Sequence, residues 1–155
     1  MIPQQDDFKR IKRVVQVSTS TYIPLPVLGE DAFLSCEEHD HGSVYRLDRD
    51  TWILAYDSFL GSEKITTTMK VSEHGLTVTT IGASHHRLTL PHDDVGSYQF
   101  FYGGMSRRMM AVLHELKYEM PTHERADGFI LFRYTLWTED SDETVFEFGR
   151  AVNLS

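Results

Sequence analysis

The stretch 64–71 reads KITTTMKV, and it decides the fold class. Its even positions carry two lysines and two threonines, whereas its odd positions carry apolar side chains and one threonine. Successive side chains of a β-strand point to opposite faces, so this period of two predicts a strand. The face with the lysines is expected to meet water, as in an antiparallel sheet. The opposite face, expected to be buried, consists of Ile65, Thr67, Met69 and Val71.

The same alternation recurs on both sides of this stretch, in segments such as 51–58, 85–90 and 129–137. Short turns rich in glycine, aspartate and serine separate the segments, at intervals near ten residues. No long crossover segment is present to connect parallel strands. The sequence therefore predicts an all-β, antiparallel, closed or nearly closed barrel of roughly eight to ten strands. We expect one barrel domain over 9–155, preceded by a loose leader at 1–8.

Composition narrows the classes of partner and the cellular compartment. The formal net charge of −8 disfavours nucleic acid and anionic membranes as partners. No apolar run is long enough to span a membrane as a helix, and the first residues do not resemble a signal peptide. Cys36 is the only cysteine, which fits a reducing compartment. We therefore expect a cytoplasmic protein without a nucleic-acid or membrane partner.

The segment 105–120 carries an ambiguous pattern. Its apolar residues recur at intervals of three and four, and good helix formers lie between them, so local propensity alone predicts a helix. The apolar positions that favour the helix are Met105, Met109, Val112, Leu113 and Leu116.

Several short patterns together resemble a known family. The chain runs through GSVY at 42–45, WILAY at 52–56, TTTMKV at 66–71, Gly82 and RLTL at 87–90. In this order the patterns resemble the YwiB-like family of bacterial proteins of unknown function, and 98–103 and 128–136 fit its second half. The chain departs from the family pattern at Thr80 and at Asp57–Ser58, so no role of the family's residues there is carried over.

The resemblance implies a calycin-like barrel, similar in outline to lipocalins and streptavidin. It also implies that 105–120 is a strand, and we follow it there, with a break expected near Leu113–His114.

Histidines and cysteine offer candidate metal or catalytic sites, and we assign none. Glu37, His39 and His41 would share one face of a strand, as a facial metal site requires, but no further ligand is evident and we favour an exposed acidic turn. His85 and His86 are expected on opposite faces and at the surface. The run 114–118, HELKY, lacks the second histidine of a zinc helix. Neither a metal nor a cofactor is predicted.

Enzyme signatures are also lacking. The chain has no phosphate-binding loop and no nucleophile turn, and the rings at 100–102 are disfavoured as a base-stacking surface by the negative charge. Cys36 lies among glutamates that would raise its pKa. We leave open one enzymatic alternative, a hydrolase or isomerase that uses a lumen carboxylate such as Asp57.

The remaining candidate site is the lumen of the barrel. An eight-stranded barrel can be filled by its side chains or can hold one small ligand. We predict a small non-enzymatic protein that binds an apolar or amphipathic ligand. The alternative is a structural or interaction module whose core is filled. Both functions are compatible with a homodimer. Rings with polar tips could bury such a ligand and fix one polar group. The expected ligand-binding residues are Trp52, Tyr56, Tyr98, Tyr102 and Tyr134.

Overall fold

The computed structural model describes residues 12–25, 30–122, 124–138 and 141–155, with side chains described at 13–21, 42–122, 124–138 and 146–155. The predicted leader at 1–8 lies outside the described residues. So do the side chains of Cys36, Glu37, His39 and His41, which the sequence analysis weighed as candidates.

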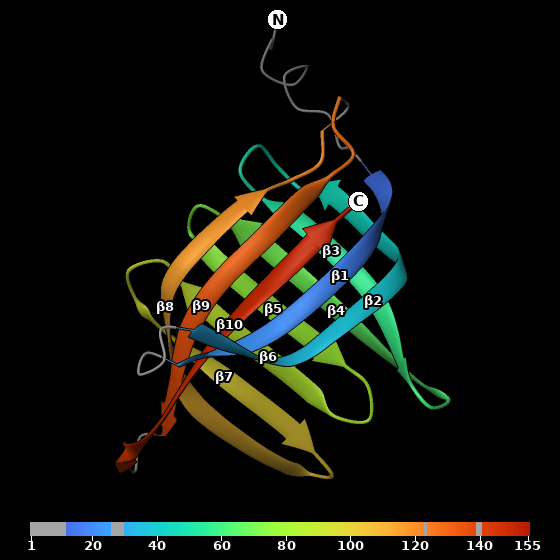
Figure 1. The fold of residues 1–155 in the computed structure, drawn as a ribbon. Helices are drawn as coiled ribbons and strands as arrows, with labels where there is room; N and C mark the ends of the chain where they lie inside the picture. The colour runs from blue at the N-terminus through green and yellow to red at the C-terminus, as the bar shows by residue number, and fades with distance from the viewer. Residues whose placement is uncertain (1–11, 26–29, 123, 139–140) are drawn as a thin grey trace, which may run out of the picture.

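The described residues form ten β-strands and no helix (Figure 1). Within them, accordingly, no helix has the length and apolarity needed to cross a membrane. The strands are β1 (Lys12–Leu25), β2 (Glu30–Arg46), β3 (Trp52–Leu60), β4 (Glu63–Ser72), β5 (Gly75–Ile81), β6 (His85–Pro91), β7 (Val95–Tyr102), β8 (Met105–Glu119), β9 (Gly128–Thr138) and β10 (Ser141–Leu154).

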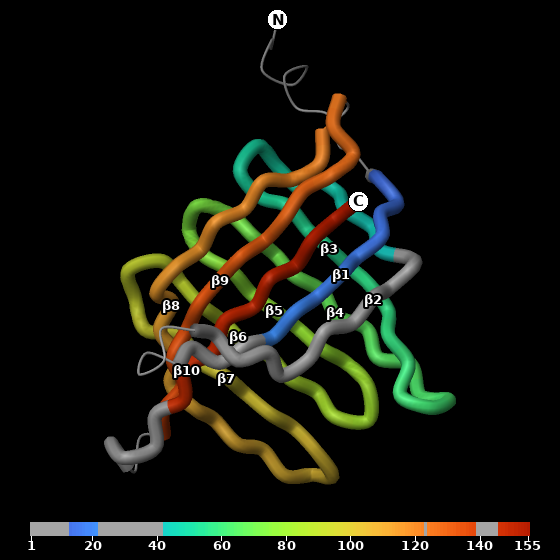
Figure 2. The backbone as a smooth tube through the Cα atoms, in the orientation of Figure 1, coloured from blue at the N-terminus to red at the C-terminus, as the bar shows by residue number. Residues whose placement is uncertain are grey.

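The strands form a closed antiparallel barrel. Each strand pairs with the next along the chain, and β10 pairs with β1, where Val17 lies opposite Leu154. Figure 2 shows the backbone of β10 passing between β9 and β1. Closure satisfies the backbone groups that a sheet edge would leave unpaired. The predicted all-β barrel is confirmed, whereas its calycin-like character stays a prediction.

The alternation in 64–71 separates the lumen from the outer wall. Met69 and Val71 are fully buried, while Lys64 and Lys70 are exposed. Leu54 of β3 lies opposite Met69 and is also fully buried. The buried, inward-facing side chains of the described strands meet in one core. Its members include Val15, Val17, Val44, Leu54, Met69, Val71, Leu76, Val78, Leu88, Leu90, Ala111, Ile130, Phe132, Val152 and Leu154.

The segment 105–120 is a strand almost throughout, as the family resemblance implies, and the local helix reading is wrong. The pairing of β8 with β9 shifts by one residue between Leu113 and Glu115, near the expected break. The extra residue, His114, reverses the phase of the alternation. Leu113 and Leu116, three residues apart, therefore lie opposite Tyr134 and Phe132 on the same face. The bulge thus produces the helix-like interval of three residues between Leu113 and Leu116.

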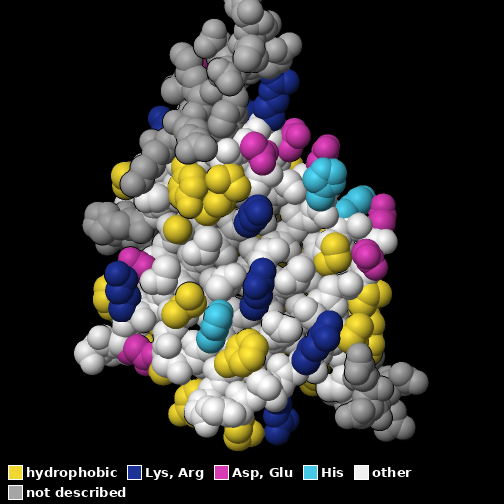
Figure 3. Space-filling model, turned by 180° about the vertical axis from the view of Figure 1, so that it is seen from behind, with side chains coloured by type: hydrophobic (Ala, Val, Ile, Leu, Met, Phe, Trp, Pro, Cys, Tyr) yellow, Lys and Arg dark blue, Asp and Glu magenta, His cyan; other side chains and the backbone are white. Residues whose placement is uncertain are grey.

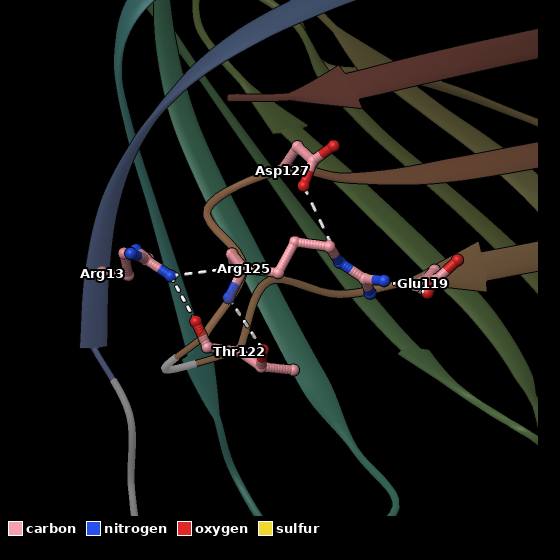
Figure 4. Close-up of polar contacts among 5 residues, drawn as sticks. All are labelled: Arg13, Glu119, Thr122, Arg125 and Asp127. Carbon is pink, nitrogen blue, oxygen red and sulfur yellow. Dashed lines mark hydrogen bonds and ion pairs between the residues drawn. The ribbon is translucent and has the colours of Figure 1, made fainter.

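One end of the barrel, which we call the closed end, is covered by the β8–β9 connection. Met120 and Pro121 at its start are buried. Arg13 of β1 reaches this connection and donates from Nη1 to the carbonyl oxygens of Thr122 and, at 3.0 Å, of Arg125 (Figure 4). The Arg125 side chain forms ion pairs with Glu119 and Asp127 at either side of the same connection.

Candidate binding site at the open end of the barrel

The lumen changes character along its axis. Mostly aliphatic side chains, with the rings of Trp52 and Tyr118 among them, fill the half next to the closed end. Toward the β5–β6, β7–β8 and β9–β10 turns, the inward row carries rings instead. Tyr102, opposite Met105, is 58% exposed, and Phe146, opposite Leu136, is 47% exposed. Side chains in the inward row are thus reached by solvent here, and we call this the open end.

On one side of the open half, β6 and β7 contribute a hydrogen-bonded group. Nδ1 of His86 lies 2.5 Å from the hydroxyl of Tyr98, and Nε2 of His86 lies 2.8 Å from Oγ of Ser84. Burial, with a smaller contribution from His85, lowers the pKa of His86, and burial raises the pKa of Tyr98. The neutral imidazole is therefore favoured, and its two nitrogens hold the ring between two hydroxyls. The ring of Phe100 packs 4.7 Å from the imidazole, centroid to centroid.

On another side, β9 and β10 contribute rings and a cation. Tyr134 packs between Phe132 and Phe148, with ring centroids 5.7 Å apart in both pairs. Arg150 lies opposite Phe132, and its guanidinium carbon sits 5.9 Å from the centre of that ring. Its Nη2 lies 3.5 Å from the hydroxyl of Tyr56, which belongs to β3. Burial raises the pKa of Tyr134, and the nearby Arg150 opposes that rise.

The structure places the five predicted ring residues in three locations. Tyr56, Tyr98 and Tyr134 face the lumen in its open half, and Tyr102 extends the same row to the rim. Trp52 has the parity of Tyr56 but lies at the start of β3, near the closed end, with Arg46 5.3 Å from its ring centre. Their role in ligand binding stays a prediction.

Sequence reasoning missed the two polar residues at the centre of this half, His86 and Arg150. Both could have been found from parity alone. His86 shares the odd-even phase of Leu88 and Leu90, which are buried. Arg150 shares the phase of Phe148 and of the fully buried Val152. The prediction that His86 is a surface residue on the face opposite His85 is therefore half correct: the faces differ, but His86 points inward.

Comparison with solved structures identifies a protein of similar architecture. The crystal structure of the ywiB protein from Bacillus subtilis superposes with a TM-score of 0.71, covering 97% of this chain and 96% of that one. The chain has the fold of YwiB. Because the identity is 12%, the likeness shows the fold alone. It agrees with the sequence resemblance described above. No protein-family model and no curated protein sequence matches the chain.

The structure also locates Asp57, the carboxylate of the enzymatic alternative. Asp57 lies on the outer wall, where its carboxylate accepts from Thr66 Oγ1 at 2.8 Å and pairs with Lys64 at 3.5 Å. It alternates with Tyr56, which faces inward, so its side chain cannot line the lumen. The proposed lumen carboxylate at Asp57 is therefore wrong.

A second hollow, unrelated to the open end, lies beside the second half of β8. It is a cleft of about 690 Å³ between β8 and the β4–β5 and β6–β7 turns. Acidic and histidine side chains gather at one rim of the face seen in Figure 3. Among the described residues, no group of three or more histidine, cysteine or acidic side chains is arranged to hold a metal ion. Lys117 and His92 already pair with two of the carboxylates in the cleft, those of Glu115 and Asp93.

Proposed function

We propose that the protein is a small, non-enzymatic binding protein of the cytoplasm that holds an amphipathic small molecule in the open half of its barrel. The observation that carries the proposal is the contrast between the two halves of one lumen. Mostly aliphatic side chains fill one half, whereas rings line the other, buried at Tyr56 and Tyr134 and more exposed toward the end of the barrel at Tyr102 and Phe146.

The chemistry of the open half fits such a ligand. Phe100 and Phe148 offer apolar surface, while Tyr56, Tyr98 and Tyr134 combine an apolar ring with a hydroxyl. Binding sites for small molecules are mostly apolar, with a few placed polar groups that set orientation. The β8–β9 connection covers the opposite end, so the ligand enters and leaves at the open end.

A blocking substitution with a matched control tests the proposal. Thr80 lies opposite Thr67 and His86 on the inward face, and its neighbour Thr79 points outward. A Thr80→Trp side chain fills the open half, whereas Thr79→Trp adds the same bulk outside. The probes are decan-1-ol, titrated in solution, and native mass spectrometry of protein purified from its own host.

We expect the unmodified protein and Thr79→Trp to bind decanol and to retain an added mass. Thr80→Trp is expected to lose both. If the unmodified protein binds no decanol and retains no mass, or if the two variants bind equally, the proposal is wrong.

A further inference from the structure

Arg150 is an inward-facing cation whose hydrogen bonds are incomplete. Its Nε is buried and has no hydrogen-bond partner among the described residues. Nη2 reaches only the hydroxyl of Tyr56, at 3.5 Å, the outer limit for a hydrogen bond. The guanidinium also lies over Phe132, which holds its stem in the lumen but satisfies no N–H group.

Two other arginines in the described part of the chain form ion pairs with carboxylates. Arg133, on the outer wall of β9, pairs with Glu147 at 3.1 Å and with Glu115 at 3.7 Å. Arg125 pairs with two carboxylates at the closed end. Among the described residues, no carboxylate forms an ion pair with Arg150. Arg125 and Arg133 thus have carboxylate partners, although Nε of Arg133, like that of Arg150, is buried and unsatisfied, whereas Arg150 faces the lumen with no described carboxylate paired to it.

Such an arrangement is costly for folding alone. A buried N–H group without a partner costs about 1–3 kcal/mol, and more where the group is charged. Buried charges in proteins are usually paired, and an unsatisfied one calls for a specific explanation. A leucine or methionine at position 150 would fill the same space without that cost.

We infer that Arg150 binds the carboxylate of an amphipathic ligand in the open half of the lumen. The Nε–H and Nη2–H groups present one edge of the guanidinium, and a carboxylate accepts from both in parallel. This inference rests on the proposed function and adds the chemical class of the ligand's polar group.

The surroundings of Arg150 fix the orientation of that ligand. The rings of Tyr134 and Phe148 lie on the open side of the Arg150–Phe132 pair, one step along the strands. A ligand with its carboxylate at Arg150 therefore places its apolar body against these rings and toward the open end. The net charge of −8 gives anions no general attraction to the protein. Selection of a carboxylate must then come from the local guanidinium.

The test compares decanoate with decan-1-ol, two probes of equal chain length that differ in their polar group. Calorimetric titrations use the full chain and two variants, Arg150→Met and Arg108→Met. Arg108 is an exposed arginine on the outer face of β8, which makes it a matched control. We expect Arg150→Met to weaken decanoate binding by about tenfold or more, because hydrogen bonds to charged groups contribute about 1.5–3 kcal/mol. Decanol binding should change little, and Arg108→Met should change neither.

A second measurement does not depend on the folding of any variant. Decanoate labelled with ¹³C at its carboxyl carbon is titrated with acid while bound to the unmodified protein. Contact with a guanidinium favours the ionised form, so the carboxyl pKa should lie below that of free decanoate. An equal or raised pKa would contradict the inference.

The outcomes separate the two proposals. If decanoate and decanol both bind, and Arg150→Met affects neither, the lumen binds ligands but Arg150 does not recognise a carboxylate. If neither probe binds the unmodified protein, the proposed function itself fails.

Discussion

His86 and Tyr98 share a hydrogen bond across the β6–β7 pair, with Nδ1 and the phenol oxygen 2.5 Å apart. Leu88, which lies opposite Tyr98, belongs to the buried core. The bond therefore sits where the aliphatic half of the lumen gives way to the polar half. Burial of His86 at this position favours its neutral form, which couples the stability of the barrel to pH.

We predict that His86 makes the protein less stable in mild acid. Its pKa in the folded state lies below the ordinary value of 6.5, mainly because burial disfavours the imidazolium. The unfolded chain then binds more protons than the folded one as the pH falls below about 6.5. The free energy of unfolding should therefore decrease from that pH down to the folded pKa and level off beneath it.

Urea titrations at pH values of about 7.5 and 5.5 measure this effect. The loss between the two should be smaller in His86→Gln than in the unmodified protein. His92→Gln, in an exposed turn, serves as the control for removal of a histidine. An equal loss in all three proteins would show that His86 does not carry the dependence.

Two leucines of β3 test how far the core extends along the barrel. Leu54 is fully buried opposite Met69, whereas Leu60, six residues on, is 71% exposed. Leu54→Ala removes buried methyl groups and leaves a cavity, so it should lower the free energy of unfolding by about 2–5 kcal/mol. Leu60→Ala should change it by less than about 0.5 kcal/mol. Urea denaturation measures both, and similar losses would place the core elsewhere.

The contact between Arg13 and the β8–β9 connection should hold the closed end in place. In Arg13→Met the carbonyl oxygen of Thr122 loses its donor, while that of Arg125 keeps the amide of Thr122 as a donor. Because water reaches these exposed groups, a loss of about 0.5–1.5 kcal/mol is expected. The amide of Thr122 donates to the carbonyl oxygen of Arg125, and the amide of Arg125 donates to Oγ1 of Thr122. Hydrogen exchange at both amides should be faster in Arg13→Met than in the unmodified protein. Arg108→Met, on the outer wall, is the control. Unchanged exchange in Arg13→Met would mean that Met120 and Pro121 hold the connection alone.

Alternation made most of the fold predictable from the sequence. In 64–71 the lysines mark the outer face without ambiguity, and the same logic oriented Tyr56, Tyr98 and Tyr134 correctly. The sequence predicted a closed or nearly closed barrel but not which strands meet to close it, because the pairing of Val17 with Leu154 joins residues from opposite ends of the chain. Such a contact leaves no local pattern.

The candidate site was only half predictable for a different reason. Parity shows which face a side chain occupies but not how deep it lies, so Trp52 and Tyr56 look equivalent although they lie at opposite ends of the lumen. Polar residues were read as surface residues by default, which hid His86 and Arg150. For both His86 and Arg150, the apolar residues two positions away along the strand indicate that the side chain faces inward.

The bulge in β8 leads to the last prediction, which concerns deletions. His114 is the extra residue between Leu113, opposite Tyr134, and Glu115, opposite Arg133. Without it, the sequence Leu-Glu-Leu-Lys-Tyr alternates regularly and can keep every pairing that β8 now makes with β9. Deletion of His114 should therefore leave the barrel folded. The cost should be about 0.5–1.5 kcal/mol, because the hydrogen bond between the His114 and Thr135 side chains is lost.

Deletion of Thr68 from the regular strand β4 is the matched control. A one-residue slip turns a strand's side chains to the opposite face. Whichever half of β4 shifts, either Lys64 or Lys70 turns into the lumen, where no described carboxylate pairs with it. The deletion of Thr68 should abolish both cooperative unfolding by urea and the dispersion of the amide signals in NMR spectra, whereas the deletion of His114 should preserve both. Equal damage from the two deletions would mean that the bulge is required by the fold, for example to bend β8 beside the cleft, and that alternation alone does not decide which residues this barrel can lose.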